Sequence, residues 1–389
     1  MTLHVFNPEH DIALASGLEN FTAPHAGRQL RHDLGFLPAL WAAADDCVLV
    51  EDAELAQASL RRIAVAAKKY LGVRGSKVES LRSKVEGLKL DAVEPWGWDA
   101  ALRGRLRRMG VAEELLPDDE QLQLIRELSH RRTSARLLQR LADDGLATAV
   151  SKMPIECCSA DEVEAALARC SRAVMKAPWS SSGRGVRFVI DVESTENNTP
   201  SPDPTPAPPL DGRGAAALKG WVRGVLARQG SVMVEPYYNK VKDFGMEFEA
   251  GADGVVSYCG LSLFHTANGA YTGNIVATEQ RKREIMSRYL STELLDRVGE
   301  RICQHLTDML QGRYQGPLGV DMMIVGAQAG FLLHPCVEIN LRRTMGHAAL
   351  ALTPDDDDRM GVMRITYANG CYKLGVEKLR RSEGGVKEE

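Results

Sequence analysis

The sequence lacks several features that would point to whole classes of protein. No apolar run in its 389 residues is long enough to cross a bilayer, and the start, MTLHVFNPEHDIALASG, has neither the basic nor the apolar segment of a signal peptide. The net charge is only −4, so no excess of basic side chains indicates a protein dedicated to nucleic acid or membrane surfaces. These absences favour a cytoplasmic protein with no membrane partner, and they argue against a nucleic-acid partner.

Cysteine is present, but it lacks the spacing of a metal site or a disulfide framework. The eight cysteines form no CxxC pair, and the two that lie closest, Cys157 and Cys158, are adjacent, which does not suit zinc. We therefore expect reduced thiols, most of them buried. The 44% hydrophobic and 26% charged residues are ordinary globular values, and the length predicts two or three structural units.

The first hundred residues alternate between strand and helix patterns. Residues 3–6, 47–50 and 88–93 read as short strands, and residues 53–71 have apolar side chains at helical spacing. This alternation predicts an open α/β unit. The loop NPEHD follows the first strand, so His10 and Asp11 either bind a substrate or cap the next helix, and the pattern favours capping.

The middle of the chain predicts helices, then a small set of strands. Residues 116–145 have helical spacing with a break near Ser129, and strand, helix and strand patterns follow them up to Lys176. Residues 193–213 are rich in Pro, Thr, Ser and Asp with little to bury, which predicts a disordered insertion. Further downstream, PLGVDMMIV and FLLHPCVEINL read as two strands of a hairpin around GAQAG.

The stretch VMKAPWSSSGRGVRFVI, residues 174–190, places a short polar loop between two apolar strands. Glycine lets backbone N–H groups approach a ligand and serine hydroxyls add donors, so the loop suits a phosphate site, although its local pattern alone favours a plain hairpin. Lys176 ends the first strand among apolar neighbours. An ammonium group beside a glycine loop suits polyphosphate binding.

Two strands far downstream carry carboxylates. Asp321 lies within an apolar strand, and Glu338 and Asn340 lie two residues apart, so their side chains face the same side of a strand. Buried carboxylates are costly unless they are paired or bind a metal, and three oxygen ligands beside a phosphate site are typical of magnesium. The alternative is a structural salt bridge to Arg342 or Arg343, which leaves Asn340 and the glycine loop unexplained.

With Lys176 before SSSGRGV, and Asp321 paired with Glu338 and Asn340, the sequence resembles the ATP-grasp superfamily, which includes glutathione synthetase and biotin carboxylase. By order of elements, the resemblance covers roughly the last two-thirds of the chain. It implies a fold of α/β and α+β units in three parts. These are a Rossmann-like domain over residues 1–116, a small α+β subdomain with the lid and the insertion over 117–235, and a large α+β subdomain with the metal site and a carboxyl-terminal tail over 236–389.

The resemblance also implies a set of phosphate contacts. Lys176 matches the strand lysine that contacts the α-phosphate and the adenine edge. Arg132, in SHRRTSARLLQ, takes the place of a phosphate-binding lysine that opens a helix. The loop 180–185 matches the mobile lid over the β- and γ-phosphates, with contacts from Ser181, Ser182, Gly183 and Gly185.

On the nucleoside, the linker VMVEPYY matches the segment that meets the adenine, which assigns Glu235 and Tyr237 there. Asp243 matches the acidic residue that takes the ribose hydroxyls, and Glu247 is the competing choice. Asp321, Glu338 and Asn340 match the ligands of Mg²⁺ or Mn²⁺. Arg342 matches an arginine beside the transferring phosphoryl group, so the resemblance gives catalytic roles to Arg342 and Lys176.

If the resemblance holds, the protein is an ATP-dependent ligase: it activates a carboxylate as an acyl phosphate, which an amine or another nucleophile attacks. Two alternatives stay open, a non-catalytic ATP-binding protein and a small-molecule kinase on the same fold. The sequence names neither the carboxylate nor the nucleophile, and it leaves homodimer formation open.

Three segments could meet the substrate. Residues 265–274, with His265, lie where members of the superfamily place loops that face the phosphates and the acceptor, and the basic run 281–283 that follows is either part of this surface or a solvated helix face. The stretch 60–110 is locally basic, with RRIAVAAKKY and RGRLRRMG. It could meet an anionic partner, although solvated helix faces are more common.

Overall fold

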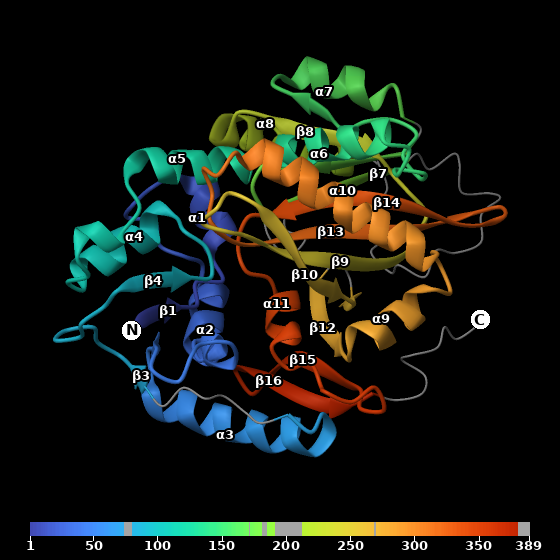
Figure 1. Cartoon of the computed structure of the whole chain (residues 1–389). Helices are drawn as coiled ribbons and strands as arrows, with labels where there is room; N and C mark the ends of the chain where they lie inside the picture. Colours follow the sequence, from blue (N-terminus) through green and yellow to red (C-terminus); the bar gives the residue numbers. More distant parts are fainter. Residues whose placement is uncertain (74–79, 171, 181–184, 191–211, 268–269, 380–389) are drawn as a thin grey trace.

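The computed structural model describes residues 1–73, 80–170, 172–180, 185–190, 212–267 and 270–379. Within them, the amino-terminal part forms a parallel sheet in the order β3-β2-β1-β4. Its strands are β1 (Thr2–Val5), β2 (Cys47–Leu49), β3 (Ser80–Arg82) and β4 (Ala92–Pro95). Its helices are α1 (His10–Ser16), α2 (His25–Leu34), η1 (Leu37–Leu40), α3 (Ala53–Tyr70) and α4 (Ala100–Arg108). The expected open α/β unit is therefore confirmed (Figure 1).

A helical segment joins this unit to the rest of the chain. It consists of η2 (Glu113–Leu115), α5 (Asp119–Leu128) and α6 (Arg131–Asp143). The helix breaks at Ser129 as predicted, and the side chain of His130 caps the new helix by accepting a hydrogen bond from the backbone N–H of Arg132. Leu137, Leu138 and Leu141 of α6 are fully buried, so this helix belongs to the central hydrophobic core.

A small antiparallel sheet follows in the order β5-β8-β6-β7. Its strands are β5 (Ile155–Cys157), β6 (Arg172–Lys176), β7 (Val186–Ile190) and β8 (Val232–Pro236), and its helices are α7 (Ala160–Leu167) and α8 (Gly212–Gln229). One face of this sheet, with Met175 and Val234, packs against α7 and α8 in a compact apolar cluster. Since side chains alternate along a strand, Lys176 and Glu235 lie on the opposite face.

The central sheet is also antiparallel, in the order β10-β9-β13-β14. Its strands are β9 (Lys240–Ala250), β10 (Val256–Ser262), β13 (Gly316–Ala327) and β14 (Gly330–Asn340), and α10 (Thr292–Leu310) packs in the same core as α6. The predicted hairpin is therefore present as β13 and β14. Its apolar side chains, such as Val320 and Ile339, fill the core. The neighbouring positions Asp321, Glu338 and Asn340 lie on the other face of the sheet.

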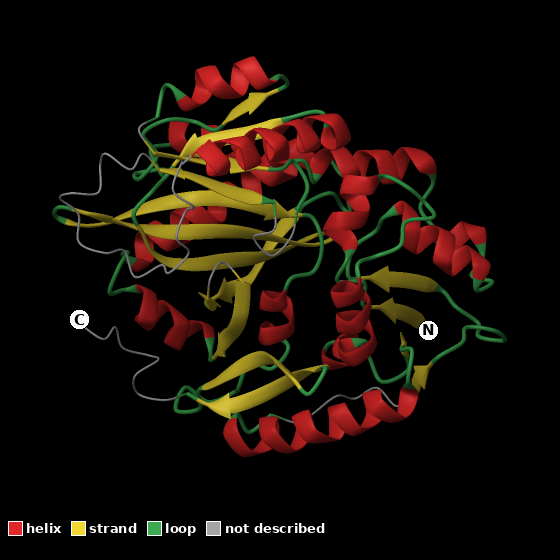
Figure 2. Cartoon of the chain, turned by 180° about the vertical axis from the view of Figure 1, so that it is seen from behind, coloured by secondary structure: helices red, strands yellow, loops and turns green. Residues whose placement is uncertain are grey.

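A fourth sheet has the strand order β11-β12-β15-β16. Its strands are β11 (Phe264–Ala267), β12 (Ala270–Val276), β15 (Gly361–Ala368) and β16 (Cys371–Lys378), and the remaining helices are α9 (Glu279–Met286) and α11 (Met345–Leu350). The hairpin β15-β16 packs against α2 and α3, so the two ends of the described chain share a core (Figures 1 and 2). The three domain boundaries stay a prediction.

Three further expectations concern the cysteines, the insertion with the tail, and membrane crossing. All eight cysteines are free thiols, but only Cys47, Cys157 and Cys336 are buried, so the prediction that most are buried is wrong. The predicted insertion falls outside the described residues except for residues 212–213, which begin α8, and the predicted tail lies outside them from residue 380. None of the described helices combines the length and apolarity that a bilayer crossing needs.

Candidate active site

Lys176 and Glu235 form a buried ion pair on the polar face of the small sheet. Both residues are more than nine-tenths buried, and they reach each other from the neighbouring strands β6 and β8. Met233 lies directly opposite Lys176 in the sheet, and Val174 lies opposite Glu235. A lysine kept at the end of an apolar strand thus has its charge balanced inside the protein, beside the loop that follows β6.

Asp321, Glu338 and Asn340 come together on the polar face of the central sheet. Asp321 and Glu338 are direct cross-strand neighbours, and the Asn340 amide donates a hydrogen bond to Asp321 Oδ2 at 3.1 Å. Burial, and then the negative charges of Glu338 and Glu247, raise the pKa of Asp321 to about 8. The three side chains thus form a cluster of oxygen ligands. The surrounding positive charges and hydrogen bonds do not fully stabilise its negative charge.

This donor set fits a hard divalent cation. Two carboxylates and one amide oxygen are ligands that Mg²⁺ prefers, and a cation between Asp321 and Glu338 would offset the burial and the repulsion that raise the Asp321 pKa. The described residues contain no group of three or more His, Cys, Asp or Glu side chains that could hold a metal. A metal here therefore needs the Asn340 oxygen and outside ligands such as water or phosphate.

Arg342 ties this cluster to the amino-terminal unit. Its guanidinium donates to both carboxylate oxygens of Asp11, at 2.9 and 2.8 Å, and to Asn340 Oδ1 at 2.9 Å. Burial acts against this pair, but the nearby charge and hydrogen bonds of Arg342 outweigh it and lower the pKa of Asp11. Arg343 pairs instead with Glu94, at 3.2 Å. The salt-bridge alternative therefore fails in its stated form, because neither arginine pairs with Asp321 or Glu338.

Asp11 thus belongs to the site, and the capping interpretation of residues 10–11 is not supported. Helix α1 has Glu9 at its N-cap position, and no side chain caps it. His10 is buried and its Nδ1 lies 3.2 Å from Asp99 Oδ2. The start of α1 therefore brings one side chain to Arg342 and another to Asp99, the N-cap residue of α4.

Arg131 is the cation that joins the two polar faces, and sequence reasoning missed it. Its Nη2 lies 2.8 Å from Glu338 Oε1, while its Nε donates to the carbonyl of Ala177 at 3.0 Å and its Nη2 to Ser180 Oγ at 3.3 Å. A single side chain thereby contacts the β14 carboxylate and the segment that follows Lys176. Its positive charge also balances the negative charge of Glu338.

The predicted phosphate ligand, Arg132, lies elsewhere. It is 47% exposed and pairs with Glu156 on β5 at 2.9 Å. The signal that could have distinguished the two arginines is helical spacing: Arg131 lies seven residues before the buried Leu138, and Arg132 seven before the exposed Gln139. Arg131 is therefore on the inward face of α6 and Arg132 on the outward one.

The glycine loop is described only at its ends. Ser181, Ser182 and Gly183, predicted to contact phosphate, lie outside the described residues. Gly185 is buried, and its carbonyl accepts a hydrogen bond from the N–H of Ala177 at 2.8 Å. A Cβ at Gly185 would lie 2.3 Å from Ser180 Cβ, so only glycine fits where the loop closes.

The predicted nucleoside contacts occupy the edges of the two polar faces. Tyr237 lies edge-to-face with Phe188, at 6.0 Å between ring centroids, and under the guanidinium of Arg172. Asp243, on β9, pairs with Lys240 at 2.9 Å and accepts a hydrogen bond from Thr266. Its competitor Glu247 is deeply buried and lies 3.0 Å from His347 Nδ1.

The other candidate substrate segments take different roles. Asn274, in β12, is fully buried and bonds Tyr271 and Ser262, while His265 lies on β11. The basic run of α9 makes ion pairs: Lys282 and Arg283 both reach Glu279, and Lys282 is buried. Arg281 is by contrast 42% exposed and pairs with Glu284, so the run is solvated only in part.

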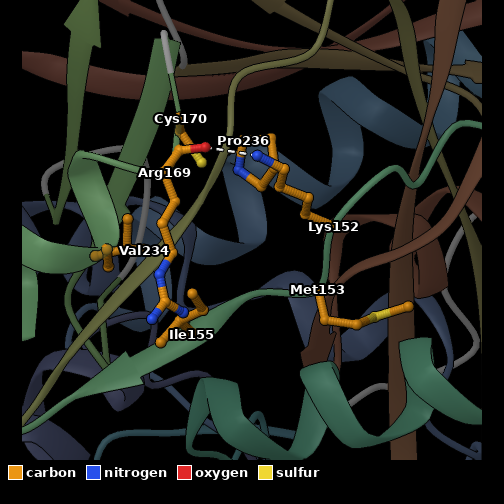
Figure 3. Close-up of a pocket in the computed structure, with 8 residues that line it drawn as sticks. Lys152, Met153, Ile155, Arg169, Cys170, Val234 and Pro236 are labelled. Atoms are coloured by element: carbon orange, nitrogen blue, oxygen red, sulfur yellow. Dashed lines mark hydrogen bonds between the residues drawn. The ribbon is translucent and has the colours of Figure 1, made fainter.

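A cavity of about 430 Å³ lies away from this site (Figure 3). Val234 and Ile155 line it from β8 and β5, and Lys152 donates a hydrogen bond to the carbonyl of Arg169 at its rim. Val234 belongs to the apolar cluster between the small sheet and α7, on the side opposite Lys176. This cavity is therefore not the polar face on which the predicted ATP contacts gather.

No protein-family model and no curated protein sequence matches the chain. Among solved structures, it is similar to N5-carboxyaminoimidazole synthetase from Staphylococcus aureus complexed with ADP, with 12% identity and a TM-score of 0.47, over 95% of this chain and 83% of that one. It is also similar to a biotin carboxylase complex from Campylobacter jejuni, with 12% identity and a TM-score of 0.45, over 94% and 75% of the two chains.

Proposed function

We propose that the chain is an ATP-grasp ligase, which uses ATP to activate a small-molecule carboxylate for attack by an amine or another nucleophile. The observation that carries this proposal is the pair of polar faces, one with Lys176 and one with Asp321 and Glu338, that Arg131 joins. Each face lies on a sheet whose other side is apolar core. Burying several charged groups together is costly even when they are paired, and such clusters concentrate at functional sites.

Different residues of the site are assigned to the phosphates, the adenine and the ribose of ATP. We assign Lys176, at the end of β6, to the phosphate oxygens and the following loop, residues 180–185, to the lid, although most of that loop lies outside the described residues. Glu235 and Tyr237 continue from β8 toward the adenine, and Asp243 is assigned to the ribose.

Asp321, Glu338 and Asn340 are the residues that would hold Mg²⁺ or Mn²⁺. A metal bound there supplies positive charge to the phosphate oxygens. Arg131 and Arg342 add fixed positive charge on either side of this cluster, and Asp11 keeps the Arg342 guanidinium in one orientation. Phosphoryl transfer depends mainly on such positioning and charge, with little covalent chemistry left to the protein.

Product analysis separates the ligase from its alternatives. The protein is incubated with Mg-ATP and pooled amino acids, peptides and carboxylates, and ADP, free phosphate and product masses are followed. A condensed product with ADP and free phosphate supports the ligase. A phosphorylated end product indicates a kinase, and tight ATP binding without turnover indicates a binding protein.

The variant Glu338→Gln tests the site. We expect it to fold normally and to lower ATP turnover by about 100-fold or more, because one preorganised charge is lost. The matched control is Glu113→Gln, whose parent side chain is 62% exposed in an ion pair with Arg107. Near-normal turnover in Glu338→Gln would refute the assignment.

We further propose a cytoplasmic enzyme with three units at residues 1–116, 117–235 and 236–389, and a homodimer as its solution state. Limited proteolysis tests the boundaries, since cleavage sites concentrate in exposed linkers. Size-exclusion chromatography with light scattering tests the dimer. A monomeric mass at micromolar concentration rules it out.

A further inference from the structure

A second polar pocket, of about 220 Å³, lies in the amino-terminal unit. Asn7 and Glu9, after β1, and Asp99, after β4, form one side of it. In the sheet order β3-β2-β1-β4, the strands β1 and β4 flank the point where the connections diverge to opposite sides. Open α/β sheets bind ligands at this switch point, outside the carboxyl ends of the strands.

Four arginines from two helices converge on the pocket. Arg28 and Arg31 lie three residues apart on α2, and Arg105 and Arg108 lie three apart on α4. Residues at this spacing share a helix face, so both helices turn a pair of guanidinium groups toward the same cavity. A solvated basic face on each helix would not require this convergence.

The pocket holds more positive charge than its own carboxylates balance. Arg31 is paired with Glu9 and with Glu51, but Arg105 reaches Glu51 only at 4.0 Å. Within the described part of the chain, the guanidinium groups of Arg28 and Arg108 make no ion pair or hydrogen bond. Burial, and then the charge of Arg31, lower the pKa of Arg105. An anion placed among these groups relieves that repulsion.

Glu9 also offers the pocket a hydrogen-bond acceptor. Glu9 is more than nine-tenths buried, and its Oε2 has no hydrogen-bond partner among the described residues. Asn7 and Asp99 are by contrast bonded to each other, at 3.0 Å, so they form a fixed floor. A ligand that suits the pocket therefore carries an oxyanion for the arginines and an N–H or O–H donor for Glu9.

This pocket and the candidate active site share one short segment of the chain. Glu9 lines the pocket, and Asp11, two residues later, holds Arg342 beside the presumed metal ligands. One short loop thus contributes a side chain to each place. A small molecule that binds in the pocket through one end would therefore extend along the segment that carries Asp11.

We propose that the pocket binds the anionic end of the acceptor substrate, a small molecule with a carboxylate or phosphate group and a neighbouring hydroxyl or amine. The role as acceptor site rests on the proposed ligase function, whereas oxyanion binding itself does not require ATP turnover. The proposal also gives a purpose to the basic stretch RGRLRRMG, whose Arg105 and Arg108 line the pocket.

Calorimetric titration of the full-length protein tests the proposal. Inorganic phosphate and acetate are titrated separately at constant ionic strength, without nucleotide. We expect one of them to bind, and the double variant Arg28→Gln/Arg108→Gln to weaken that binding by about tenfold or more, since charge-assisted hydrogen bonds are lost. Both parent side chains are exposed, so the variant keeps its fold. The matched control Arg62→Gln, on the exposed side of α3, binds as the parent does.

The variant Lys176→Gln, checked by circular dichroism, separates this pocket from the ATP site. Retained binding in Lys176→Gln, with loss in the arginine variant, supports the pocket, and tighter binding of phosphate or of acetate identifies which oxyanion the acceptor carries. Failure of both probes to bind the parent protein overturns the proposal. Equal binding in the arginine variant and the Arg62→Gln control also overturns it. Either failure leaves the effect of Glu338→Gln on ATP turnover as an independent result for the proposed function.

Discussion

Asp144, at the end of α6, and Asp321, on β13, are carboxylates in opposite surroundings. Arg301 donates two hydrogen bonds to Asp144, at 2.7 and 2.8 Å, and His305 lies 2.7 Å away. These contacts lower the pKa of Asp144 to about 2. Asp321 has one amide donor and faces Glu338, and its surroundings raise its pKa to about 8.

The two opposite pKa shifts distinguish a carboxylate that stabilises the fold, Asp144, from one that we propose binds a ligand, Asp321. Asp144 joins α6 to α10, and every oxygen of its carboxylate is used within the chain. For Asp321, burial and the charges of Glu338 and Glu247 outweigh the support that Asn340 and Arg342 give to its ionised form, yet it lies where a cation and phosphate are proposed to bind. Shifts of this kind concentrate at functional sites, where a protein gives up local stability for binding.

The largest expected effect separates activity from stability at Asp321. We expect Asp321→Asn to lower ATP turnover by about 100-fold or more, because a metal ligand and its charge are lost. The free energy of unfolding should stay the same or rise, since an amide avoids the cost of ionising a buried carboxyl group beside Glu338. ADP release and urea denaturation measure the two quantities. Loss of stability together with activity would show that Asp321 is a structural residue.

The two adjacent arginines give the next contrast. Arg131→Ala removes the contacts to Glu338 and to the segment after Lys176, so we expect ATP turnover to fall by about 100-fold. Arg132→Ala removes an exposed pair with Glu156 and should change stability by less than about 1 kcal/mol, with turnover unchanged. Steady-state kinetics on both variants decide between them. A large loss in Arg132→Ala alone would restore the assignment made from the family resemblance.

The alternating pattern of strands allowed much of this site to be predicted. Glu338 and Asn340, two residues apart, do face the same side of β14, and Asp321 lies opposite Glu338 in the sheet, because side chains alternate along an apolar strand. Lys176 stood out because it was charged among apolar residues, and burial confirms that it is held inside. These features depend on local spacing, which a single sequence contains.

Contacts between distant segments could not be predicted in this way. The pair between Arg342 and Asp11 spans 331 positions, and nothing in NPEHD identifies its partner. The packing of β16 on α3 likewise depends on how the termini meet. The strand β3 has only the three residues SLR, with no apolar run to indicate it. Arg131 is a different case, since its helical spacing to Leu138 was present in the sequence.

The pH dependence of stability sharpens the contrast further. The folded-state pKa of Asp321, about 8, lies above its ordinary value of 3.8, so the folded protein keeps a proton that the unfolded chain releases. The contribution of this group to stability is therefore most favourable below pH 4, and it falls as the pH rises toward about 8. The difference in unfolding free energy between the parent and Asp321→Asn, measured from pH 5 to 8 without metal, should change in that direction. A difference that does not vary with pH contradicts the raised pKa.

A small effect, confined to stability, is expected at Asp144. Its lowered pKa means that its stabilising contribution is present above pH 4 and is lost as the pH falls toward about 2, the reverse of the dependence at Asp321. Asp144→Asn should cost about 1 kcal/mol at neutral pH, because the pair with Arg301 is partly exposed to solvent, and should leave ATP turnover unchanged. Urea denaturation at pH 7 and pH 3 measures the cost, which should shrink at the lower pH. If Asp144→Asn lowered turnover as much as Asp321→Asn, the two carboxylates would not differ in role, and the packing of α6 against α10 would itself control the active site.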